Sequence, residues 1–576
     1  MSAGIRDLPI ALLAAVLVAA CGDGGTPAAR PTATVTVAAT ASPSASVTAS
    51  PSASATRSAA PTPSDSPAPP VTATASDTAS PTATATQPPL RLPDLHAEPD
   101  AELGGRIVDA EGRAVLLRGV NVNALAEYWR YGAFATVFPL TEADADQMAA
   151  IGWNAVRLLL SWSRVEPAPG EYDAAYLEQV RTVVRLLASR GIYTILDLHQ
   201  DAWGATLVAR PDEVCAPPGE LAFGWDGAPG WATLDGGAPR CATLGIRELS
   251  PAVSAAFAAF FADATDTTGV GIRTRYAAML GHLARVLAAE PGVAGYDLMN
   301  EPNAFSEEEI AQLADLYADA IVAIRAGERD GGSPTRLVLF EPSAAWALLG
   351  VGAPADFARD RDVVYAPHLY QGGLDTQALA PAFAKARDEA KRYGGAPVLT
   401  GEWGSDPRRA SDPADPYFLE HQRLQDESRI GATLWTWHES CGDPHKAGDV
   451  RAGNVPYVWG EFEVDCTSNT IAGLRQDLVA QLTRGYVRAA PGRLVATTYD
   501  PDTGVLTASG VDAPAGAELL AFFPSADEID GVIGQVGLTD VRLLREAADR
   551  PYITARAVGG PWRITAIPPS DATRAR

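Results

Sequence analysis

The sequence contains little positive charge for its length. Its 576 residues include 45 lysines and arginines against 70 aspartates and glutamates, so the formal net charge is −25, and only Lys385, Lys391 and Lys446 are lysines. Phosphate backbones and anionic membranes both attract basic protein surfaces. The composition therefore argues against nucleic acid as a partner and against electrostatic docking on a membrane.

Aromatic residues are absent from the start of the chain, since Tyr128 is the first. Residues 22–97 consist largely of alanine, threonine, serine and proline in imperfect repeats such as Ala-Ser-Pro-Ser-Ala-Ser. A segment of this composition has too little apolar surface to bury a core. We expect a disordered linker over residues 22–97 that holds a folded part away from a surface.

An apolar run at residues 8–20 follows Arg6 and is too short for an ordinary membrane-spanning helix. It ends in Leu-Val-Ala-Ala-Cys at 17–21, which resembles a bacterial lipobox, in which the cysteine carries a lipid. We therefore expect a lipoprotein-type signal peptide over 1–21, with an ordinary signal peptide as the alternative. Lipidation of Cys21 would place the protein on the extracellular side of the bacterial cell envelope, lipid-anchored or secreted.

Cysteine is scarce, and its spacing is informative. Besides Cys21, the chain has two pairs with similar separations, Cys215/Cys241 and Cys441/Cys466. In an exported protein we expect each pair to form a disulfide, the alternative being reduced, buried thiols. The sequence has no Cys-x-x-Cys motif and no histidine-rich tract. We therefore expect no metal and no cofactor.

From residue 98 onward, strand-like and helical segments alternate. Eight segments have strand character, with helical patterns between them: 115–120, 155–160, 192–198, 293–299, 337–340, 363–365, 397–400 and 432–435. This alternation predicts a (β/α)8 TIM barrel over residues 98–485. Residues 203–272 form an insertion with three tryptophans and one cysteine pair. We expect it to form a wall of the cleft, or else a patch that stabilises the side of the barrel.

Residues 486–570 show a different pattern of short alternating runs. The segment Asp-Pro-Asp-Thr-Gly at 500–504 predicts a turn between two of these runs. We expect a C-terminal all-β sandwich domain with a structural role, packed on the barrel.

Two glutamates follow predicted strands. Glu301 lies in Asn-Glu-Pro at 300–302, where Pro302 prevents further strand pairing, and Glu402 follows the strand at 397–400. A β/α barrel carries its catalytic groups at the C-terminal ends of its strands. A retaining glycosidase needs two such carboxylates, ~5 Å apart. The two glutamates are therefore candidates for catalysis.

Several motifs together resemble those of glycoside hydrolase family 5, a family of retaining barrel glycosidases, and within it the endoglycoceramidases. They are Leu-Arg-Gly-Val-Asn at 117–121, Asn-Ala-Val-Arg at 154–157, Asp-Leu-His-Gln-Asp at 197–201, Gly-Tyr-Asp-Leu-Met-Asn-Glu-Pro at 295–302, His-Leu-Tyr at 368–370 and Gly-Glu at 401–402. The resemblance covers about residues 100–570.

The resemblance implies Glu301 as the acid/base and Glu402 as the nucleophile, and Arg157 as the cation that keeps Glu402 ionised, although Arg157 also suits a structural salt bridge. The other residues it implies for substrate binding are His199, Asp201, Asn300, His368, Tyr370 and Trp437. Trp435 is an alternative to Trp437 as the aromatic platform beneath the sugar. The resemblance thus places all these side chains around one bound sugar.

Two positions depart from the endoglycoceramidase pattern: the chain has no lysine soon after the first strand, and Arg273 stands where glutamine is expected. The identity of the sugar therefore stays open. We expect a monomeric retaining endo-β-glycosidase that cleaves the bond between glycan and lipid in glycosphingolipids. The alternatives are a family 5 β-glucanase, cellulase or β-glucosidase, including one acting on steryl glucosides, and a non-catalytic carbohydrate-binding lipoprotein.

Overall fold

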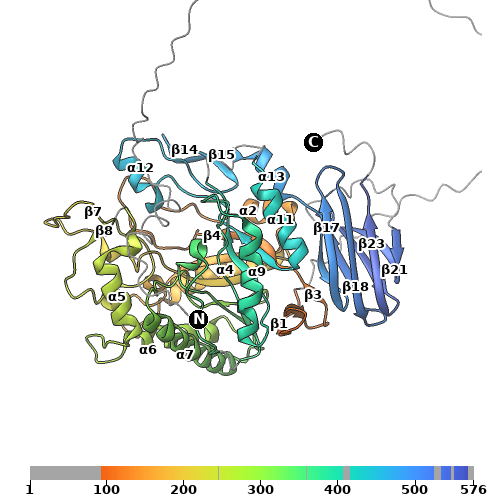
Figure 1. Cartoon of the computed structure of the whole chain (residues 1–576), viewed down its shortest axis with the longest axis horizontal. Helices are drawn as coiled ribbons and strands as arrows, with labels where there is room; N and C mark the ends of the chain where they lie inside the picture. Colours follow the sequence, from red (N-terminus) through yellow and green to blue (C-terminus); the bar gives the residue numbers. More distant parts are fainter. Residues whose placement is uncertain are drawn as a thin grey trace, which may run out of the picture. The chain divides into compact units, whose positions relative to one another are not determined.

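The computed structural model describes residues 92–243, 245–357, 360–406, 415–524, 534–546 and 550–568 (Figure 1). The expected signal peptide, including Cys21, lies outside the described residues. So does the expected linker, except for its C-terminal end, where strand β1 (Leu95–Glu98) begins.

Eight parallel strands form the barrel predicted from the sequence. Their order around the sheet is β11-β10-β9-β6-β5-β4-β13-β12, and a parallel bridge between Tyr365 and Val398 closes it. Both faces of such strands are covered, which explains why each residue of the apolar run in β5 is buried. The strands are β4 (Arg118–Val122), β5 (Ala155–Ser161), β6 (Tyr193–His199), β9 (Val293–Asp297), β10 (Leu337–Phe340), β11 (Val363–Tyr365), β12 (Leu399–Trp403) and β13 (Gly431–Leu434).

Helices follow most of these strands, and the sequence marks their ends. Thr141 and Asp144 form a capping box at the start of α2, while Gly152 ends it with φ 97°. Asp173 caps α4, whose buried residues recur with helical spacing. Helices α6 and α7 lie side by side (Figure 1). The main helices are α2 (Glu142–Ile151), α4 (Ala174–Ser189), α6 (Ile272–Val286), α7 (Glu307–Gly331), α9 (Leu379–Ala390) and α11 (Tyr417–Ser428), with short α3 (Trp162–Val165) and α8 (Trp346–Leu349).

The insertion after β6 carries the strand pair β7 (Gly219–Leu221) and β8 (Cys241–Thr243), followed by α5 (Pro251–Phe261). The predicted Cys215–Cys241 disulfide is confirmed. The ring of Trp231 packs edge-on against Trp162, 5.3 Å between centroids, on the side of the barrel. One part of the insertion therefore packs against the side of the barrel and stabilises it. Another part reaches the cavity described below.

Two antiparallel sheets form the C-terminal domain, and they share one apolar core. The larger sheet has the order β1-β2-β3-β16-β19-β22-β21, and the smaller has the order β17-β18-β23-β20. The turn predicted at 500–504 is present, since Gly504 N donates to Asp500 O at 2.7 Å. The strands are β2 (Arg106–Asp109), β3 (Ala114–Val115), β16 (Tyr486–Ala490), β17 (Arg493–Asp500), β18 (Val505–Ala513), β19 (Glu518–Phe522), β20 (Gly534–Val536), β21 (Leu538–Glu546), β22 (Arg550–Ala557) and β23 (Gly560–Ala566).

The larger sheet contains strands from before the barrel, which the sequence did not predict. Val115 pairs with Ala489 of β16, so the predicted strand at 115–120 is divided between β3 and the barrel strand β4. The run from 114 to 122 is buried throughout, and periodicity gives no sign of the change from one sheet to the other. The chain thus enters the barrel from the sandwich and returns to it.

The two domains pack closely at Gly152. The Tyr486 hydroxyl donates to Gly152 O at 2.8 Å, and a Cβ at this glycine would lie 2.4 Å from the ring of Phe522. Glycine is therefore needed here both for the positive φ and for the close approach. Among the described helices, none is both long and apolar enough to cross a membrane.

A buried carboxyl group near the end of the barrel provides a test of the packing. Burial raises the pKa of Glu461 to about 8, against an ordinary 4.5, and the Trp153 indole donates to its Oε1 at 2.9 Å. The folded protein keeps a proton here that the unfolded chain releases. The free energy of unfolding should therefore fall as pH rises from about 4.5 to about 8.

We predict that Glu461→Gln stabilises the protein by about 3–5 kcal/mol at pH 8.5 and by little at pH 5, because glutamine has no proton to lose. Urea unfolding at the two pH values measures this difference. The exposed neighbour Glu463→Gln serves as the control. An equal effect of Glu461→Gln at both pH values would contradict the assignment.

Candidate active site

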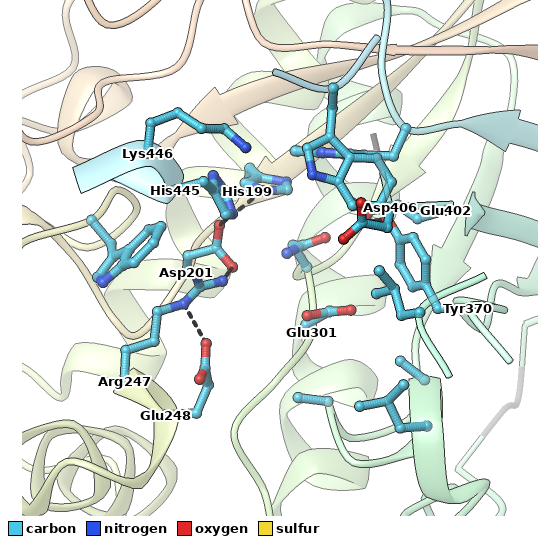
Figure 2. Close-up of a pocket in the computed structure, with 18 of the residues that line it drawn as sticks. His199, Asp201, Arg247, Glu248, Glu301, Tyr370, Glu402, Asp406, His445 and Lys446 are labelled. Atoms are coloured by element: carbon cyan, nitrogen blue, oxygen red, sulfur yellow. Dashed lines mark hydrogen bonds and ion pairs between the residues drawn. The ribbon is translucent and has the colours of Figure 1, made fainter. Parts of the chain in front are cut away.

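A cavity of about 460 Å³ opens at the C-terminal ends of the barrel strands (Figure 2). Of the residues selected from the sequence, six line it: His199, Asp201, Asn300, Glu301, Tyr370 and Glu402. Arg157 and His368 are buried directly behind this lining, in contact with the glutamates. The structure thus brings together residues that are up to 245 positions apart in the chain.

Glu301 and Glu402 lie close together. One carboxylate oxygen of each and a ring nitrogen of His368 all lie within 4.8 Å of one another. His368 Nδ1 lies 2.9 Å from Glu301 Oε1 and 3.5 Å from Glu402 Oε2. Retaining glycosidases use a separation of ~5 Å between carboxyl groups, whereas inverting enzymes need a wider gap to hold a water molecule. The arrangement matches the retaining geometry.

Arg157 is fully buried and binds the carboxylates beneath the cavity. Its Nη1 donates to Glu402 Oε1 at 2.8 Å, and its Nε donates to Asp297 Oδ2 at 2.9 Å. Its Nη2 lies 2.9 Å from Asp197 Oδ1 and 2.8 Å from Glu341 Oε1. Burial, together with Glu341 and Asp197, raises the pKa of Asp297 to about 8 despite Arg157. The sequence analysis did not select Asp197 and Asp297; acidic residues inside the apolar strands β6 and β9 were the available signal.

Glu402 is held at both oxygens. Tyr370 donates its hydroxyl to Glu402 Oε2 at 2.8 Å, opposite the Arg157 contact at Oε1. Burial raises the pKa of Glu402; His368 and Arg157 act against this, and Glu301 adds to it. Burial alone would lower the pKa of His368, but Glu341 and Glu402 outweigh it and hold that pKa well above its ordinary value. This shift favours the charged form of His368, whose Nδ1 faces both glutamates.

One wall of the cavity is polar. Arg247 Nη2 lies 2.9 Å from Asp201 Oδ1, and Lys446 Nζ lies 3.0 Å from Glu439 Oε2. Figure 2 shows Asp201, Arg247 and Lys446 on the side opposite Glu402. Such paired donors and acceptors suit sugar hydroxyl groups. Arg247 comes from the insertion after β6 and Lys446 from the loop after β13, both far beyond the ends of these strands, so a position at a strand end does not mark them.

The other wall is apolar and begins beside Glu301. Its side chains come from the loops after β9, β10, β11 and β13: Phe305, Ala344, Ala347, Leu348, Leu374, Val455, Tyr457 and Trp459. Val455 and Tyr457 are 72% and 58% exposed at the mouth of the cavity. An apolar wall continuous with an exposed apolar rim suits a hydrophobic group that extends out of the cavity.

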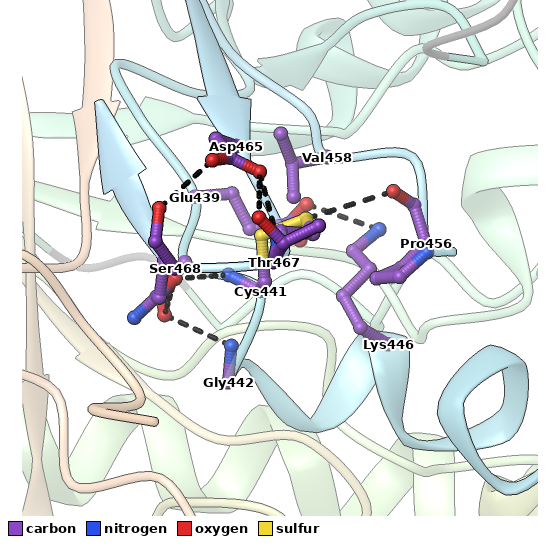
Figure 3. Close-up of a disulfide and its surroundings, with 12 residues drawn as sticks. Glu439, Cys441, Gly442, Lys446, Pro456, Val458, Asp465, Thr467 and Ser468 are labelled. Carbon is purple, nitrogen blue, oxygen red and sulfur yellow. Dashed lines mark hydrogen bonds and ion pairs between the residues drawn. A yellow bond between two sulfur atoms is a disulfide. The ribbon is translucent and has the colours of Figure 1, made fainter. Parts of the chain in front are cut away.

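The loop after β13 contributes to both walls, and the predicted Cys441–Cys466 disulfide, confirmed here, closes it (Figure 3). Glu439 connects the two sides of this loop. Its Oε2 accepts from Trp459 N at 2.7 Å and lies 3.0 Å from Lys446 Nζ. The buried Glu439 and the disulfide therefore hold the polar Lys446 and the aromatic Trp459 in place within one loop.

The prediction that Trp437 is the sugar platform is wrong. Its side chain is fully buried outside the cavity, with Nε1 donating to Asp144 Oδ1 at 3.0 Å and its ring packed edge-on against Phe462. Trp435 lines the cavity instead, and its ring stacks with His199 at 5.5 Å between centroids. Strand β13 ends at Leu434, before both tryptophans. The alternation of side chains along a strand therefore does not predict which way Trp435 and Trp437 point.

Several groups of carboxylates and histidines lie close enough together to hold a metal ion, among them His199 with Asp201 and Asp226. Within the described residues, however, arginine side chains already form ion pairs with several of these carboxylates. Arg157 contacts Asp197, Asp297 and Glu341, and Arg247 contacts Asp201. The arrangement of the groups is therefore that of ion pairs between side chains.

The two tryptophans should behave differently on substitution. We predict that Trp435→Ala weakens binding of a β-linked disaccharide such as lactose by about ten-fold and leaves the fold intact. Trp437→Ala should instead lower the free energy of unfolding by about 3–5 kcal/mol, as loss of a buried aromatic ring does. Titration calorimetry and urea unfolding measure the two effects. Weakened binding by a fully stable Trp437→Ala protein would contradict the assignment.

Known proteins resemble this chain in sequence. Endoglycoceramidase I of Rhodococcus hoagii (strain 103S) is 30% identical over 289 residues, 46% of this chain and 52% of the relative. An endoglycoceramidase of Hydra vulgaris is 26% identical over 211 residues, 34% of this chain and 39% of the relative. The alignments thus span about half or less of these curated relatives.

Solved structures resemble it as well. The crystal structure of an endogalactoceramidase is 36% identical, with a TM-score of 0.73 over 83% of this chain and 100% of that one. Endo-glycoceramidase II from Rhodococcus sp., as a lactosyl-enzyme intermediate, is 27% identical, with a TM-score of 0.61 over 80% of this chain and 99% of that one. The family model for cellulase, glycosyl hydrolase family 5, matches residues 108–440. Since this match covers more than half of the chain and contains both glutamates with Arg157, the protein belongs to glycosyl hydrolase family 5.

Proposed function

We propose that this protein is a retaining endo-β-glycosidase that cleaves the bond between the glycan and the lipid of a glycosphingolipid. The observation that carries the proposal is the pair Glu301 and Glu402, with carboxylate oxygens within 4.8 Å, between a polar and an apolar wall. Relatives and neighbours named endoglycoceramidase and endogalactoceramidase support the same substrate class.

In the first step, Glu402 attacks the anomeric carbon of the sugar bound against the polar wall. The bond from this carbon to the lipid oxygen breaks, an ester to Glu402 forms, and Glu301 gives its proton to the leaving lipid alcohol. In the second step, Glu301 takes a proton from water, whose oxygen displaces Glu402 from the anomeric carbon. Two inversions give net retention of configuration.

The surrounding groups fit these steps. Arg157 and Tyr370 hold the two oxygens of Glu402, so its orientation toward the sugar is fixed before reaction. Glu301 acts as the acid in the first step and, once Glu402 is an ester, as the base in the second, which is the change of role that a retaining mechanism requires.

The apolar wall supports a lipid leaving group over a second sugar. Phe305 follows Glu301 by four residues, and Leu348 and Leu374 continue the wall on the same side of the cavity. A glucan chain needs hydrogen-bonding groups along its path, and of the eight side chains in this wall only Tyr457 and Trp459 carry one. The match to a cellulase model makes a β-glucanase, or a β-glucosidase that includes steryl glucosides, the second candidate.

We also propose that the protein acts as a monomer, anchored by a lipid on Cys21 to the outside of the bacterial cell envelope. The lipobox-like sequence at 17–21 and the linker composition of residues 22–91 support this location. The linker would let the cavity reach a glycolipid in a nearby membrane.

A substrate panel tests the proposed activity. We expect the protein to release intact glycan and ceramide from lactosylceramide or galactosylceramide, and to be much less active on a soluble cello-oligosaccharide. Glu301→Gln and Glu402→Gln should each lower kcat by at least about 1,000-fold while retaining the folded structure. Activity confined to the cello-oligosaccharide would favour the glucanase; inactivity on every substrate would favour a carbohydrate-binding protein.

The apolar wall can be tested separately from the chemistry. We predict that Leu374→Ser lowers kcat/KM for lactosylceramide by about ten-fold and changes hydrolysis of an aryl β-lactoside little, because only the lipid contacts this wall. Val322→Ser, an exposed position on α7, serves as the matched control. Equal losses on both substrates would contradict a lipid-binding role for the wall.

The pH dependence of kcat/KM tests the role of Glu402. Because the reactive form is the carboxylate and burial raises the Glu402 pKa above 4.5, activity should fall on acidification at a pH above 4.5. Tyr370→Phe removes a donor to the carboxylate and should move this acid limb upward by about one pH unit. A downward shift or no shift would contradict the assignment of this limb to Glu402.

A further inference from the structure

A second cavity, of about 330 Å³, lies at the opposite end of the barrel. Its lining includes Leu116, Val398 and Gly431, at or before the N-terminal ends of β4, β12 and β13. Strands β2 and β17 of the sandwich supply Arg106 and Arg493 to the same cavity. The cavity therefore lies between the barrel and the sandwich, and it shares no residue with the catalytic cavity.

This second cavity carries an excess of positive charge in a protein with a net charge of −25. Its ionisable lining comprises five cations, Arg106, Arg387, Lys391, Arg429 and Arg493, and three anions, Asp100, Glu102 and Asp388. Asp100 pairs with Arg493 at 2.5 Å, and Asp388 with Lys391 at 2.8 Å. Arg106 pairs with Glu98, outside the lining, at 2.6 Å.

The remaining two arginines have no carboxylate partner among the described residues. Arg429 is half-buried at the C-terminal end of α11 and donates only to the backbone oxygens of Glu427 and Val495, both at 3.1 Å. Arg387, on α9, makes no ion pair in the described part of the chain. Burial and the charges of Arg387 and Arg493 lower the pKa of Arg429. Three guanidinium groups of like charge thus line one cavity, and of the three carboxylates in the lining Asp100 and Asp388 already pair with Arg493 and Lys391.

We propose that this cavity binds a phosphate group, through Arg387 and Arg429 with support from Arg493. Guanidinium groups present paired donors that match phosphate oxygens, and a phosphate would relieve the repulsion between them. The cavity also has apolar lining from Leu103, Ile107, Ile430 and Leu494. Its volume exceeds that of a phosphate ion, so a phosphomonoester with a small organic group suits it as well as the free ion.

A phosphate in this position would contact both domains. Arg387 lies in the barrel helix α9 and Arg429 caps the barrel helix α11, whereas Arg493 belongs to the sandwich strand β17. Ligand binding to the folded protein alone raises its stability. Phosphate should therefore raise the unfolding temperature of the whole protein and leave glycoside hydrolysis unchanged, because the catalytic glutamates lie at the other end of the barrel.

Titration calorimetry and thermal unfolding at constant ionic strength test the proposal, with inorganic phosphate, glycerol 3-phosphate, acetate and chloride as probes. We expect saturable binding of phosphate, glycerol 3-phosphate or both with a dissociation constant of about 1 mM or below, and none of acetate or chloride. Stronger binding of glycerol 3-phosphate would identify an organic phosphate as the ligand, and stronger binding of phosphate the free ion.

Arg387→Gln should weaken phosphate binding by about ten-fold, and this exposed position is tolerant of change. Arg429→Gln should have a similar effect, and Arg387→Gln keeps the test valid if Arg429→Gln fails to fold. Arg285→Gln, exposed on α6, removes the same charge elsewhere and should bind like the unchanged protein. Absence of saturable binding of both phosphate and glycerol 3-phosphate, or equal binding by Arg387→Gln and Arg285→Gln, would overturn the proposal.

Discussion

The site depends on one buried ion-pair network centred on Arg157. A guanidinium without access to water is stable only with anionic partners, and Arg157 contacts carboxylates from four strands or strand ends: Asp197, Asp297, Glu341 and Glu402. The same contacts fix the position of Glu402, so the interaction that stabilises the barrel interior also orients the proposed nucleophile. Removing Arg157 would leave these buried carboxylates without their shared positive partner. A substitution at Arg157 would therefore disturb the barrel interior and the position of Glu402 together.

The loops outside this network determine what the cavity accepts. The insertion after β6 supplies Arg247 to the polar wall, and the disulfide-closed loop after β13 supplies Lys446 to the polar wall and Trp459 to the apolar one. A rigid barrel with variable loops separates the chemistry from the choice of substrate. This division accounts for a chain that matches a cellulase model across its barrel and solved structures named endogalactoceramidase and endo-glycoceramidase II over most of its length.

Local patterns in the sequence were sufficient to predict the barrel strands, both disulfides and the positions of Glu301 and Glu402. Apolar runs that end in polar residues carry this information, because the C-terminal ends of parallel strands meet at one face. Trp437 was misassigned because the chain departs from strand geometry after Leu434, and Arg247 and Lys446 were missed because they reach the cavity from loops. The division of residues 114–122 between two sheets depends on pairing with β16, a contact between distant residues that no local pattern reports.

Trapping the glycosyl-enzyme intermediate tests the central claim most directly. The 2-fluoro group of a 2-fluoro-lactosyl fluoride slows both steps by destabilising their oxocarbenium-like transition states, while the fluoride leaving group keeps the first step fast enough for the ester to accumulate. The account predicts a mass increase equal to one 2-fluoro-lactosyl group in the intact protein, located on the peptide that contains Glu402 and absent from Glu402→Gln. No mass increase despite turnover of lactosylceramide, or a label on any residue other than Glu402, would contradict it.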